Sequence, residues 1–310
     1  MLAPIALFVH SRLDHTERTV SALQQNMLAQ RTPLYIFSDG ARDDNVGERL
    51  AVNAVREYLK SITGFLSVEI IERSENLGLK RNILDGLNSV TTQYDSVIVI
   101  EDDCVTSSDF LQYMNHQLAA FKCDETVWHI ASWSPGLNVE GDIYRSHFMS
   151  CWGWATWSEC WKKLNLDAYD LMRRMSIRDR YRFNLSNTYP FFSHLVGNFL
   201  GQNNTWAIYW AATVFTNGGF CINPVKTRLT NVGMDGSGSH KVQRMPQETD
   251  MTTPHGMGRV VTDPYVHDEL QKKLHSLLKF RERLFMWLKM LFPVKAYKLI
   301  YRFKEGIGRC

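Results

Sequence analysis

The sequence of 310 residues has no apolar run that could cross a bilayer. A membrane-spanning helix needs about 20 consecutive apolar residues, and no uninterrupted segment approaches that length. An apolar run near the start, Pro4–Val9, is short and is followed by polar residues, so we expect no cleaved secretory signal. These absences predict a cytoplasmic protein.

Cysteine motifs are also missing. The six cysteines form no Cys-x-x-Cys pair and follow no regular spacing, which disfavours both a structural zinc site and a disulfide scaffold. Internal repeats and low-complexity segments are absent as well. A globular protein of a reducing compartment agrees best with this composition.

Charge is distributed unevenly along the chain. Hydrophobic residues make up 45% of the sequence, enough for the core of one large α/β domain or of two. Residues 271–310 contain eleven Lys or Arg against two Glu, a net charge of +9, so residues 1–270 carry −6. A basic segment on an acidic body favours a negatively charged surface partner, either anionic lipid or nucleic acid.

Strand-like and helix-like segments alternate four times in the first half of the chain. The expected strands are 4–9, 34–37, 66–71 and 96–101, with helices at 14–30, 46–62 and 76–87. This alternation predicts an α/β fold in which a mixed, mostly parallel sheet has helices on both faces. After residue 107 the pattern loosens, and residues 226–264 form a long polar stretch that we expect to be a loop.

The stretch Ser96–Asp103 organises the chain. Its β-branched run predicts a strand buried on both faces, and the run ends in three acids, Glu101, Asp102 and Asp103. Ligands of open α/β sheets bind beyond the carboxyl ends of the strands, and clustered carboxylates repel one another unless a cation lies among them. We therefore expect a divalent metal site that takes a phosphate-bearing substrate; the alternative is a helix N-terminus decorated with acids.

Polar residues also follow the other expected strands. His10 and Arg12 follow the first, and Asp39-Gly40 follows the second. Asp39 can accept from a base edge and Arg12 can reach phosphate, although an Asp-Gly pair alone is also a common turn. Asn76 and Lys80 flank a helix start that can hold a diphosphate, or that is simply a capped helix with a basic face.

The succession of these motifs carries a resemblance. The order FVHSR, FSDG, ENLGLKRN, IVIEDDC and GWATW resembles GT-A glycosyltransferases, in particular N-acetylglucosaminyltransferase I and family-2-like bacterial sugar transferases of surface-polysaccharide synthesis. The resemblance implies a GT-A domain over residues 1–262, with a nucleotide-sugar half (1–125) and an acceptor half with a closing loop (126–262). It also implies that Asp103 binds the metal directly, and that Glu101 and Asp102 lie on the donor side, with Asp102 at the ribose.

A second motif of these bacterial enzymes is similar to Asn231–His240, NVGMDGSGSH. By this resemblance His240 is a second ligand of the metal, delivered by a loop that closes over the diphosphate. The metal would be Mn²⁺ or Mg²⁺, and an imidazole suits Mn²⁺ better. Taken alone, His240 is better interpreted as an exposed loop histidine, and only the acids upstream favour the ligand role.

Tryptophans gather in the second half of the chain. Flat aromatic faces suit sugar rings, and the residues that we expect to line the sugar or acceptor pocket are Trp152, Gly153, Trp154 and Trp206. Gly153 would allow the backbone to approach a ligand closely. The other tryptophans are expected in the core.

The catalytic base is the weakest match to the family. Inversion at the anomeric carbon needs a carboxylate that takes the acceptor's proton, and related sequences have an aspartate where this chain has Asn204. An amide cannot accept that proton. Glu159 or Asp235 could serve instead, or the reaction could proceed without a carboxylate base.

Residues 263–310 are expected to form basic amphipathic helices. Asp263-Pro264 is a helix start, and leucines recur at helical spacing at 270, 274, 277, 284, 288 and 291. An in-plane helix on anionic lipid agrees with this pattern; the alternative is a helix packed on the domain or on a second subunit.

These observations predict a metal-dependent hexosyl- or N-acetylhexosaminyl-transferase, peripheral on the inner face of the cell membrane. Its substrates would be a nucleotide-diphosphate sugar and a glycan or lipid-linked glycan acceptor. One alternative is a degenerate GT-A module that binds without turnover, which Asn204 favours. Another is a nucleotidyltransferase, although the chain has no Gly-rich basic first loop. No nucleic acid is expected, because the basic tail carries no recognition motif.

Overall fold

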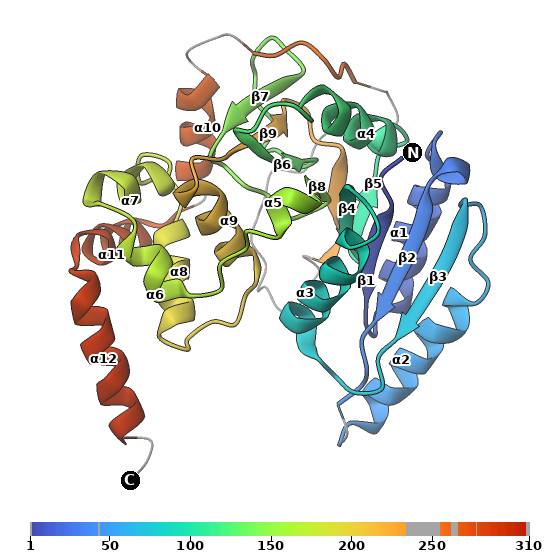
Figure 1. The fold of residues 1–310 in the computed structure, drawn as a ribbon, viewed down its shortest axis with the longest axis horizontal. Coiled ribbons are helices and arrows are strands. Elements are labelled where there is room, and N and C mark those ends of the chain that lie inside the picture. Colours follow the sequence, from blue (N-terminus) through green and yellow to red (C-terminus); the bar gives the residue numbers. More distant parts are fainter. Residues whose placement is uncertain (1, 43, 234–254, 262–265, 277, 308–310) are drawn as a thin grey trace. The chain divides into compact units, whose positions relative to one another are not determined.

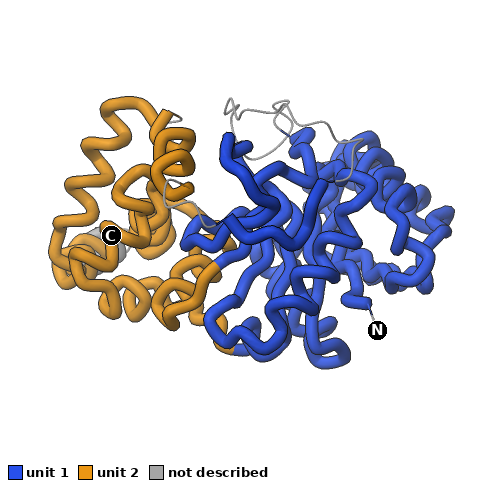
Figure 2. Tube along the Cα trace, turned by 90° about the horizontal axis from the view of Figure 1, so that it is seen from above, with its two compact units in different colours: residues 1–162, 221–263 blue, residues 163–220, 264–310 orange. Residues whose placement is uncertain are grey.

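The computed structural model describes residues 2–42, 44–233, 255–261, 266–276 and 278–307. The chain divides into two compact units, drawn in two colours in Figure 2. The first unit combines residues 1–162 with 221–263, and the second combines 163–220 with 264–310. This division differs from the predicted boundary at residue 263, because the helices of residues 163–220 pack with the C-terminal helices rather than on the sheet.

The first unit is built on an eight-stranded sheet of order β3-β2-β1-β4-β8-β6-β9-β7 (Figure 1). Its strands are β1 (Ile5–Val9), β2 (Pro33–Ser38), β3 (Ser67–Glu72), β4 (Ser96–Glu101), β6 (Val127–Ala131), β7 (Ile143–Ser146), β8 (Trp154–Trp157) and β9 (Phe220–Pro224). β1 pairs in parallel with β2 and β4, and β2 pairs in parallel with β3. β8 then runs antiparallel to both β4 and β6, and β7 is antiparallel to β9. The predicted mixed sheet of the GT-A fold class is confirmed.

Helices cover the parallel half of the sheet on both faces. The connections are α1 (Leu13–Gln24), α2 (Val46–Leu59) and α3 (Gly78–Thr91), with the short 3-10 turn η1 (Ala29–Arg31) before β2. β1, β2 and β3 follow one another in one direction across the sheet, whereas the return from β3 to β4 reverses that direction. Right-handed crossovers therefore place α1 and α2 on one face and α3 on the other. Gly86 of α3 lets that helix approach Phe8 and Phe37 closely.

A two-stranded sheet lies directly after the acid motif. β5 (Cys104–Thr106) pairs antiparallel with β10 (Leu229–Asn231), so Asn231 lies opposite Cys104. The polar stretch 226–264, expected to be a loop, thus begins with a strand. Its residues 234–254 lie outside the described part of the chain. The remaining helices of this unit are α4 (Phe110–Ala120) and α5 (Ser158–Trp161).

The second unit is helical in its described residues. It contains α6 (Ala168–Arg173), α7 (Ile177–Phe183), α8 (Phe191–Phe199), α9 (Ala207–Thr216), α10 (Val266–His275), α11 (Phe280–Leu291) and α12 (Val294–Ile307). α8 packs against α6, α9 and α11. In the described ranges, every helix is too short or too polar to cross a membrane.

The predicted leucine stripe of the tail is divided between two helices. Leu270 and Leu274 of α10 are buried, whereas Leu284, Leu288 and Leu291 of α11 are exposed. The chain leaves the helix at His275 and begins a new one at Phe280, so the helical register does not carry over. The five described leucines of the stripe therefore do not form one amphipathic face, and Leu277 lies outside the described residues.

Candidate active site

Three neighbouring strands bring the predicted polar residues to one edge of the sheet. In the parallel register Phe8 lies opposite Phe37 on one side and opposite Glu101 on the other. The carboxyl ends of β2, β1 and β4 therefore lie level with one another (Figure 1). This edge is where open α/β sheets bind their ligands.

Arg12 joins the first strand end to the acid motif. Its guanidinium contacts both carboxylate oxygens of Asp102 and donates from Nη2 to Asp103 Oδ2 over 2.8 Å. Thr19 of α1 donates to the backbone oxygen of Asp102 over 2.8 Å, which fixes the turn that carries the acids. The Arg12, Asp102 and Asp103 side chains are hereafter called the acid–arginine cluster.

Burial and mutual repulsion shape the charges of this cluster. Burial raises the pKa of Asp102, and the nearby Arg12 charge partly offsets the effect. Burial opposes the charged form of Arg12, but Asp102 and Asp103 outweigh it and raise the pKa of Arg12. Burial, with the carboxylates of Asp103 and Asp102, raises the pKa of Glu101 to about 8. The Arg12 guanidinium is therefore a permanent cation beside the two acids of the cluster and beside Glu101, and the negative charges of these three acids repel one another.

Hydrogen bonds join the turn after β2 to the turn before α3. Asp39 Oδ1 accepts from the backbone N–H of Gly40 over 2.9 Å and from that of Leu77 over 2.8 Å. Asn76 Nδ2 donates to Gly40 O over 2.7 Å. A Cβ on Gly40 would lie 2.4 Å from the carbonyl carbon of Glu75, so only glycine permits this approach. These bonds thus bring Asp39 and Asn76, both predicted to bind the donor, together at this edge of the sheet.

His10 has a carboxylate partner that the sequence did not reveal. Its Nε2 lies 3.0 Å from Glu48 Oε1 and 3.1 Å from Gly40 O. Glu48 is buried, which by itself raises its pKa, but a hydrogen bond from Arg42 and the charges of Arg42 and His10 lower it overall. The sequence signal for Glu48 was only its position three residues after the helix cap Asn45, which says nothing about His10.

Lys80 lies in the first turn of α3, as predicted. This helix begins at the same edge of the sheet because it follows the carboxyl end of β3, and the residue that caps it, Leu77, makes no side-chain cap. Burial lowers the pKa of the Lys80 ammonium. The position suits an anionic ligand, which would offset that burial.

The beginning of the predicted closing motif lies against Asp103. The backbone N–H of Val232 donates to Asp103 O over 2.8 Å, and Asn231 Nδ2 donates to Asp103 Oδ1 over 3.4 Å. A Cβ on Gly233 would lie 2.2 Å from Asp103 Oδ2 and 2.9 Å from Arg12 Nη1. The segment Asn231–Gly233 therefore needs glycine at its end to reach the acid–arginine cluster. Asp235 and His240 lie outside the described residues.

The donor set at Asp103 fits a hard divalent cation. Carboxylate oxygens are ligands that Mg²⁺ and Mn²⁺ prefer, and Asp103 has two of them: Oδ2 accepts from Arg12 and Oδ1 accepts from the Asn231 amide nitrogen. Among the residues that the structure describes, however, no three His, Cys, Asp or Glu side chains are grouped as a metal site. Asp103 would supply part of the coordination sphere of such an ion, and in this arrangement the Arg12 guanidinium is the positive charge beside it.

The aromatic segment differs from the expected pocket. Trp154 is fully buried and stacks on His129 at 5.1 Å, so it is a core residue rather than a pocket residue. Gly153 has a φ of +56°, and a Cβ there would meet Leu229 and Ser132, so the close approach that it permits is to the protein itself. Trp152 is half-buried, with its ring edge-on to Trp133 at 5.0 Å. It is the one member of this tripeptide that is open to solvent.

Glu159 lies at the wrong edge of the sheet for a catalytic base. β8 runs antiparallel to β4, with Trp157 opposite Ser96, so Glu159 comes after the amino end of β4. The length of β4, roughly 20 Å, separates it from Asp103. Its carboxylate is exposed and pairs with Lys162 over 2.6 Å.

Two further predicted residues belong to the second unit. Asn204 is exposed in the loop before α9, and Trp206, at the start of that helix, is 4% exposed. The burial of Trp206 places it in the core of the helical unit. The role of Asn204 at the base position stays a prediction.

Two solved structures of known proteins are similar to part of this chain. One similar solved structure is the mannosyltransferase PcManGT from Pyrobaculum calidifontis in complex with GDP-Man and Mn²⁺, at 12% identity and a TM-score of 0.38 over 70% of each chain. Another is glucosyl-3-phosphoglycerate synthase from Mycobacterium tuberculosis with Mn²⁺, UDP-glucose and phosphoglyceric acid, at 14% identity and a TM-score of 0.28 over 51% of this chain and 57% of that one.

Comparison with curated protein sequences gave no match. The family model described as the GNT-I family matches residues 1–202, which include β1 to β8 and the whole acid–arginine cluster. The predicted resemblance to N-acetylglucosaminyltransferase I and the GT-A assignment are thereby confirmed. The chain belongs to the GNT-I family of GT-A glycosyltransferases.

Proposed function

We propose that this protein is a metal-dependent glycosyltransferase that moves a sugar from a nucleotide-diphosphate sugar to an acceptor hydroxyl. The observation that carries the proposal is the acid–arginine cluster at the edge where β2, β1 and β4 end, with Asn231–Gly233 held against Asp103. Membership of the GNT-I family supports the reaction class. The cluster supports a substrate with a diphosphate, because Arg12 and a cation bound at Asp103 would both attract phosphate oxygens.

The nucleoside end of the donor would bind between the turns after β1 and β2. His10, Asp39 and Asn76 line this part of the edge and are fixed there by their bonds to Gly40 and Leu77. Asp102 would accept from a ribose hydroxyl. Lys80, whose burial disfavours its charge, would gain most from a nearby phosphate.

Asp103, together with His240, would hold a Mn²⁺ or Mg²⁺ ion, which when bound would neutralise the charge of the departing diphosphate. Arg12 contributes a second positive charge at the same place. Its guanidinium keeps N–H donors beyond those that contact the acids, and these suit phosphate oxygens. Arg12 therefore orients the acids and adds to the stabilisation of the leaving group.

The reaction needs a proton acceptor. The acceptor oxygen forms a bond to the anomeric carbon, the bond from that carbon to the diphosphate oxygen breaks, and the hydroxyl proton passes to a base. Asn204 cannot take this proton and Glu159 lies at the other edge of the sheet, which leaves Asp235 as the carboxylate candidate for an inverting mechanism.

The acceptor that we propose is a lipid-linked glycan of surface-polysaccharide or O-antigen-type synthesis, reached from the cytoplasmic face of the membrane. The basic C-terminal segment, with eleven Lys or Arg against two Glu in residues 271–310, supports this assignment. An acceptor with a lipid anchor would be presented at the same anionic surface that attracts such a segment.

Donor hydrolysis tests the proposal directly. Purified protein is incubated with Mn²⁺ and a panel of UDP- and GDP-sugars, and release of nucleoside diphosphate is measured for the wild type and for Asp103→Asn. A matched control is Asp14→Asn, an exposed acid of α1. We expect one donor to be hydrolysed by the wild type and the control but not by Asp103→Asn.

Two other outcomes would overturn the proposal. Metal-dependent binding of a donor with no turnover, with or without acceptors, would assign the degenerate module that Asn204 favours. Release of pyrophosphate from a nucleoside triphosphate with a sugar phosphate would assign a nucleotidyltransferase.

A further inference from the structure

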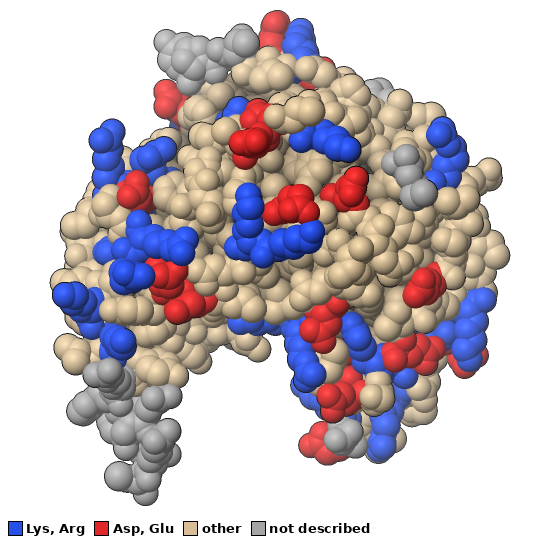
Figure 3. Space-filling view, in the orientation of Figure 1, with Lys and Arg blue, Asp and Glu red and all other residues tan. Residues whose placement is uncertain are grey.

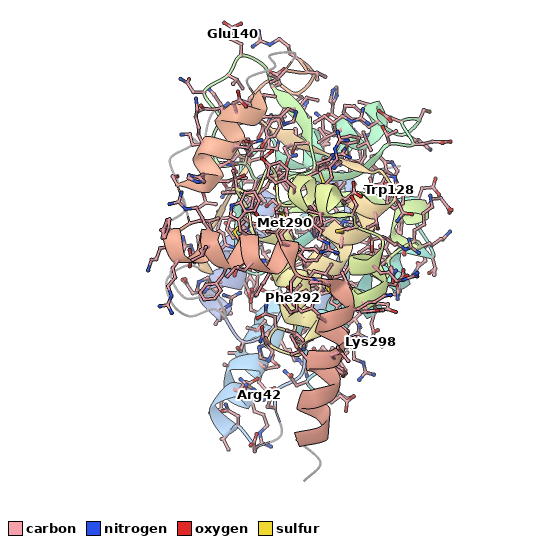
Figure 4. The ribbon with its side chains drawn as sticks, turned by 90° about the vertical axis from the view of Figure 1, so that its left-hand side faces the viewer. Arg42, Trp128, Glu140, Met290, Phe292 and Lys298 are labelled. Atoms are coloured by element: carbon pink, nitrogen blue, oxygen red, sulfur yellow. The ribbon has the colours of Figure 1, made fainter. Side chains whose placement is uncertain are left out.

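Helix α11 of the second unit has one apolar face that packs inward. Met286 and Met290 are buried, and the helix packs on α7 and α8. The buried Arg180 of α7 donates to the backbone oxygens of Met290 and Phe292 over 2.9 and 3.0 Å. These bonds pair carbonyl groups at the C-terminal end of α11 that the helix itself leaves without a donor. Met290 and Phe292 are labelled in Figure 4. These contacts hold the helix in a fixed rotation about its axis.

That rotation turns a second apolar face outward. We call it the α11 outer face, and it consists of Phe280, Leu284, Trp287, Leu288 and Leu291. Their spacing places them on one side of the helix, and each is between 44% and 76% exposed. A soluble surface rarely gathers five large apolar side chains in one stripe, so this stripe indicates an interaction site.

Basic residues border the α11 outer face. Lys279, Arg281 and Arg283 belong to the first turn of α11 or its cap, against a single acid, Glu282. α12 continues the pattern with the exposed Lys295, Lys298 and Leu299. In the space-filling view, Lys and Arg side chains, with a few Asp and Glu, lie on the left-hand side, where Figure 1 places α11 (Figure 3). The apolar stripe is thus framed by positive charge.

We propose that the α11 outer face docks on an anionic lipid surface, with α11 lying in the plane of the interface. The proposal rests on the proposed function, because a lipid-linked acceptor makes a membrane the surface where the enzyme works. A helix of this kind buries its apolar face about 5–10 Å into the headgroup boundary while its cations meet anionic lipids. Aromatic residues such as Trp287 and Phe280 favour this boundary.

The charge pattern argues against a second copy of this chain as the occupant. A symmetric contact would bring the same three cations, Lys279, Arg281 and Arg283, against themselves, with only Glu282 to compensate. Anionic headgroups would instead neutralise them. The lipid surface is therefore the partner whose chemistry complements both the stripe and its border.

Vesicle flotation of the full chain tests this. The probes are phosphatidylcholine vesicles with and without phosphatidylglycerol, and the variant is the double substitution Leu284→Gln with Leu288→Gln. The matched control is Leu50→Gln with Leu66→Gln, two leucines of the first unit that are 67% and 60% exposed. We expect the wild type and the control to float with phosphatidylglycerol vesicles, less so in high salt, and the α11 variant to lose about tenfold or more in partitioning.

Three results would overturn the proposal. They are a wild type that floats with neither vesicle, an α11 variant that floats as the wild type does, and a concentration-dependent dimer that the α11 variant abolishes. Thermal unfolding of each variant checks that it is folded. Donor hydrolysis without vesicles, which should be equal in wild type and variant, separates the two proposals: flotation without any donor turnover would refute the proposed function and leave lipid docking standing.

Discussion

Arg12 donates from Nη2 to Asp103 Oδ2 over 2.8 Å, although 91 residues separate the two in the sequence. The same guanidinium contacts Asp102, so one cation pairs with two of the three acids of the motif. Asp103 is also the residue that we propose as a metal ligand. A divalent ion bound there would therefore compete with Arg12 for the Asp103 carboxylate.

This competition predicts opposite effects of Arg12→Met on two ligands. Removal of the guanidinium frees the acids, so Mn²⁺ alone should bind about 3- to 10-fold more tightly. A nucleoside diphosphate with Mn²⁺ should bind about tenfold or more weakly, because phosphate loses a donor. Titration calorimetry measures both, with Arg18→Met of α1, an exposed cation 3.7 Å from Asp14, as the control. Unchanged affinity for both ligands would contradict the competition.

Gly233→Ala should damage the site without unfolding the protein. The added methyl carbon would lie 2.2 Å from Asp103 Oδ2, so either the carboxylate or the segment Asn231–Gly233 must move. We expect kcat/KM for the donor to fall about tenfold or more, with a small change in thermal stability. Gly47→Ala is a suitable control, because the nearest atom to its added carbon lies at 3.6 Å. Wild-type kinetics of Gly233→Ala would show that the segment does not act at Asp103.

Gly40→Ala should instead lower stability. Its methyl group would lie 2.4 Å from the backbone of Glu75, and backbone cannot yield as a side-chain end can. The turn would have to open and break the Asp39 contact to the Leu77 N–H. We expect a loss of about 1–3 kcal/mol in the free energy of unfolding, measured by urea denaturation. The result would be at odds with this account if Gly40→Ala were as stable as Gly47→Ala.

His129 predicts a dependence of stability on pH. Burial lowers the pKa of His129 from 6.5 to about 3, partly offset by its contact with Ser150 O. Below pH 6.5 the unfolded chain binds a proton that the folded chain does not, so stability is lost as the pH falls from 6.5 towards 3. In that window His129 lowers the free energy of unfolding by up to about 1.4 kcal/mol for each pH unit. His129→Gln should flatten the slope of unfolding free energy against pH by up to this amount, whereas His116→Gln, an exposed residue of α4, should not.

The ends of the strands could be predicted from the sequence, because they depend on the apolar runs and on the order in which strands and helices alternate. The apolar runs and the helices between them identified β1, β2 and β4, and parallel strands bring His10, Asp39 and Asp103 to one edge. The partners of those residues could not be predicted. The pairing of Arg12 with Asp103, or of His10 with Glu48, depends on side-chain directions across distant segments, which no local pattern records.

Several residues were predicted at the wrong place because the sequence does not show which way a strand runs or which way a side chain points. The alternation of strands and helices says nothing about β8, whose antiparallel course places Glu159 at the opposite edge from Asp103. Aromatic content likewise does not distinguish a pocket from a core, and Trp154 lies fully buried beside His129. In the tail, leucine spacing continued through the break between α10 and α11, so inward and outward leucines looked alike.

The most direct test of the central claim is calorimetric titration of UDP and GDP into the protein with and without Mn²⁺, for the wild type and for Asp103→Asn. The account predicts that one nucleotide binds the wild type at least about tenfold more tightly with Mn²⁺, and that Asp103→Asn loses this dependence on the metal. Binding that is indifferent to Mn²⁺, or a metal effect that survives in Asp103→Asn, would contradict it.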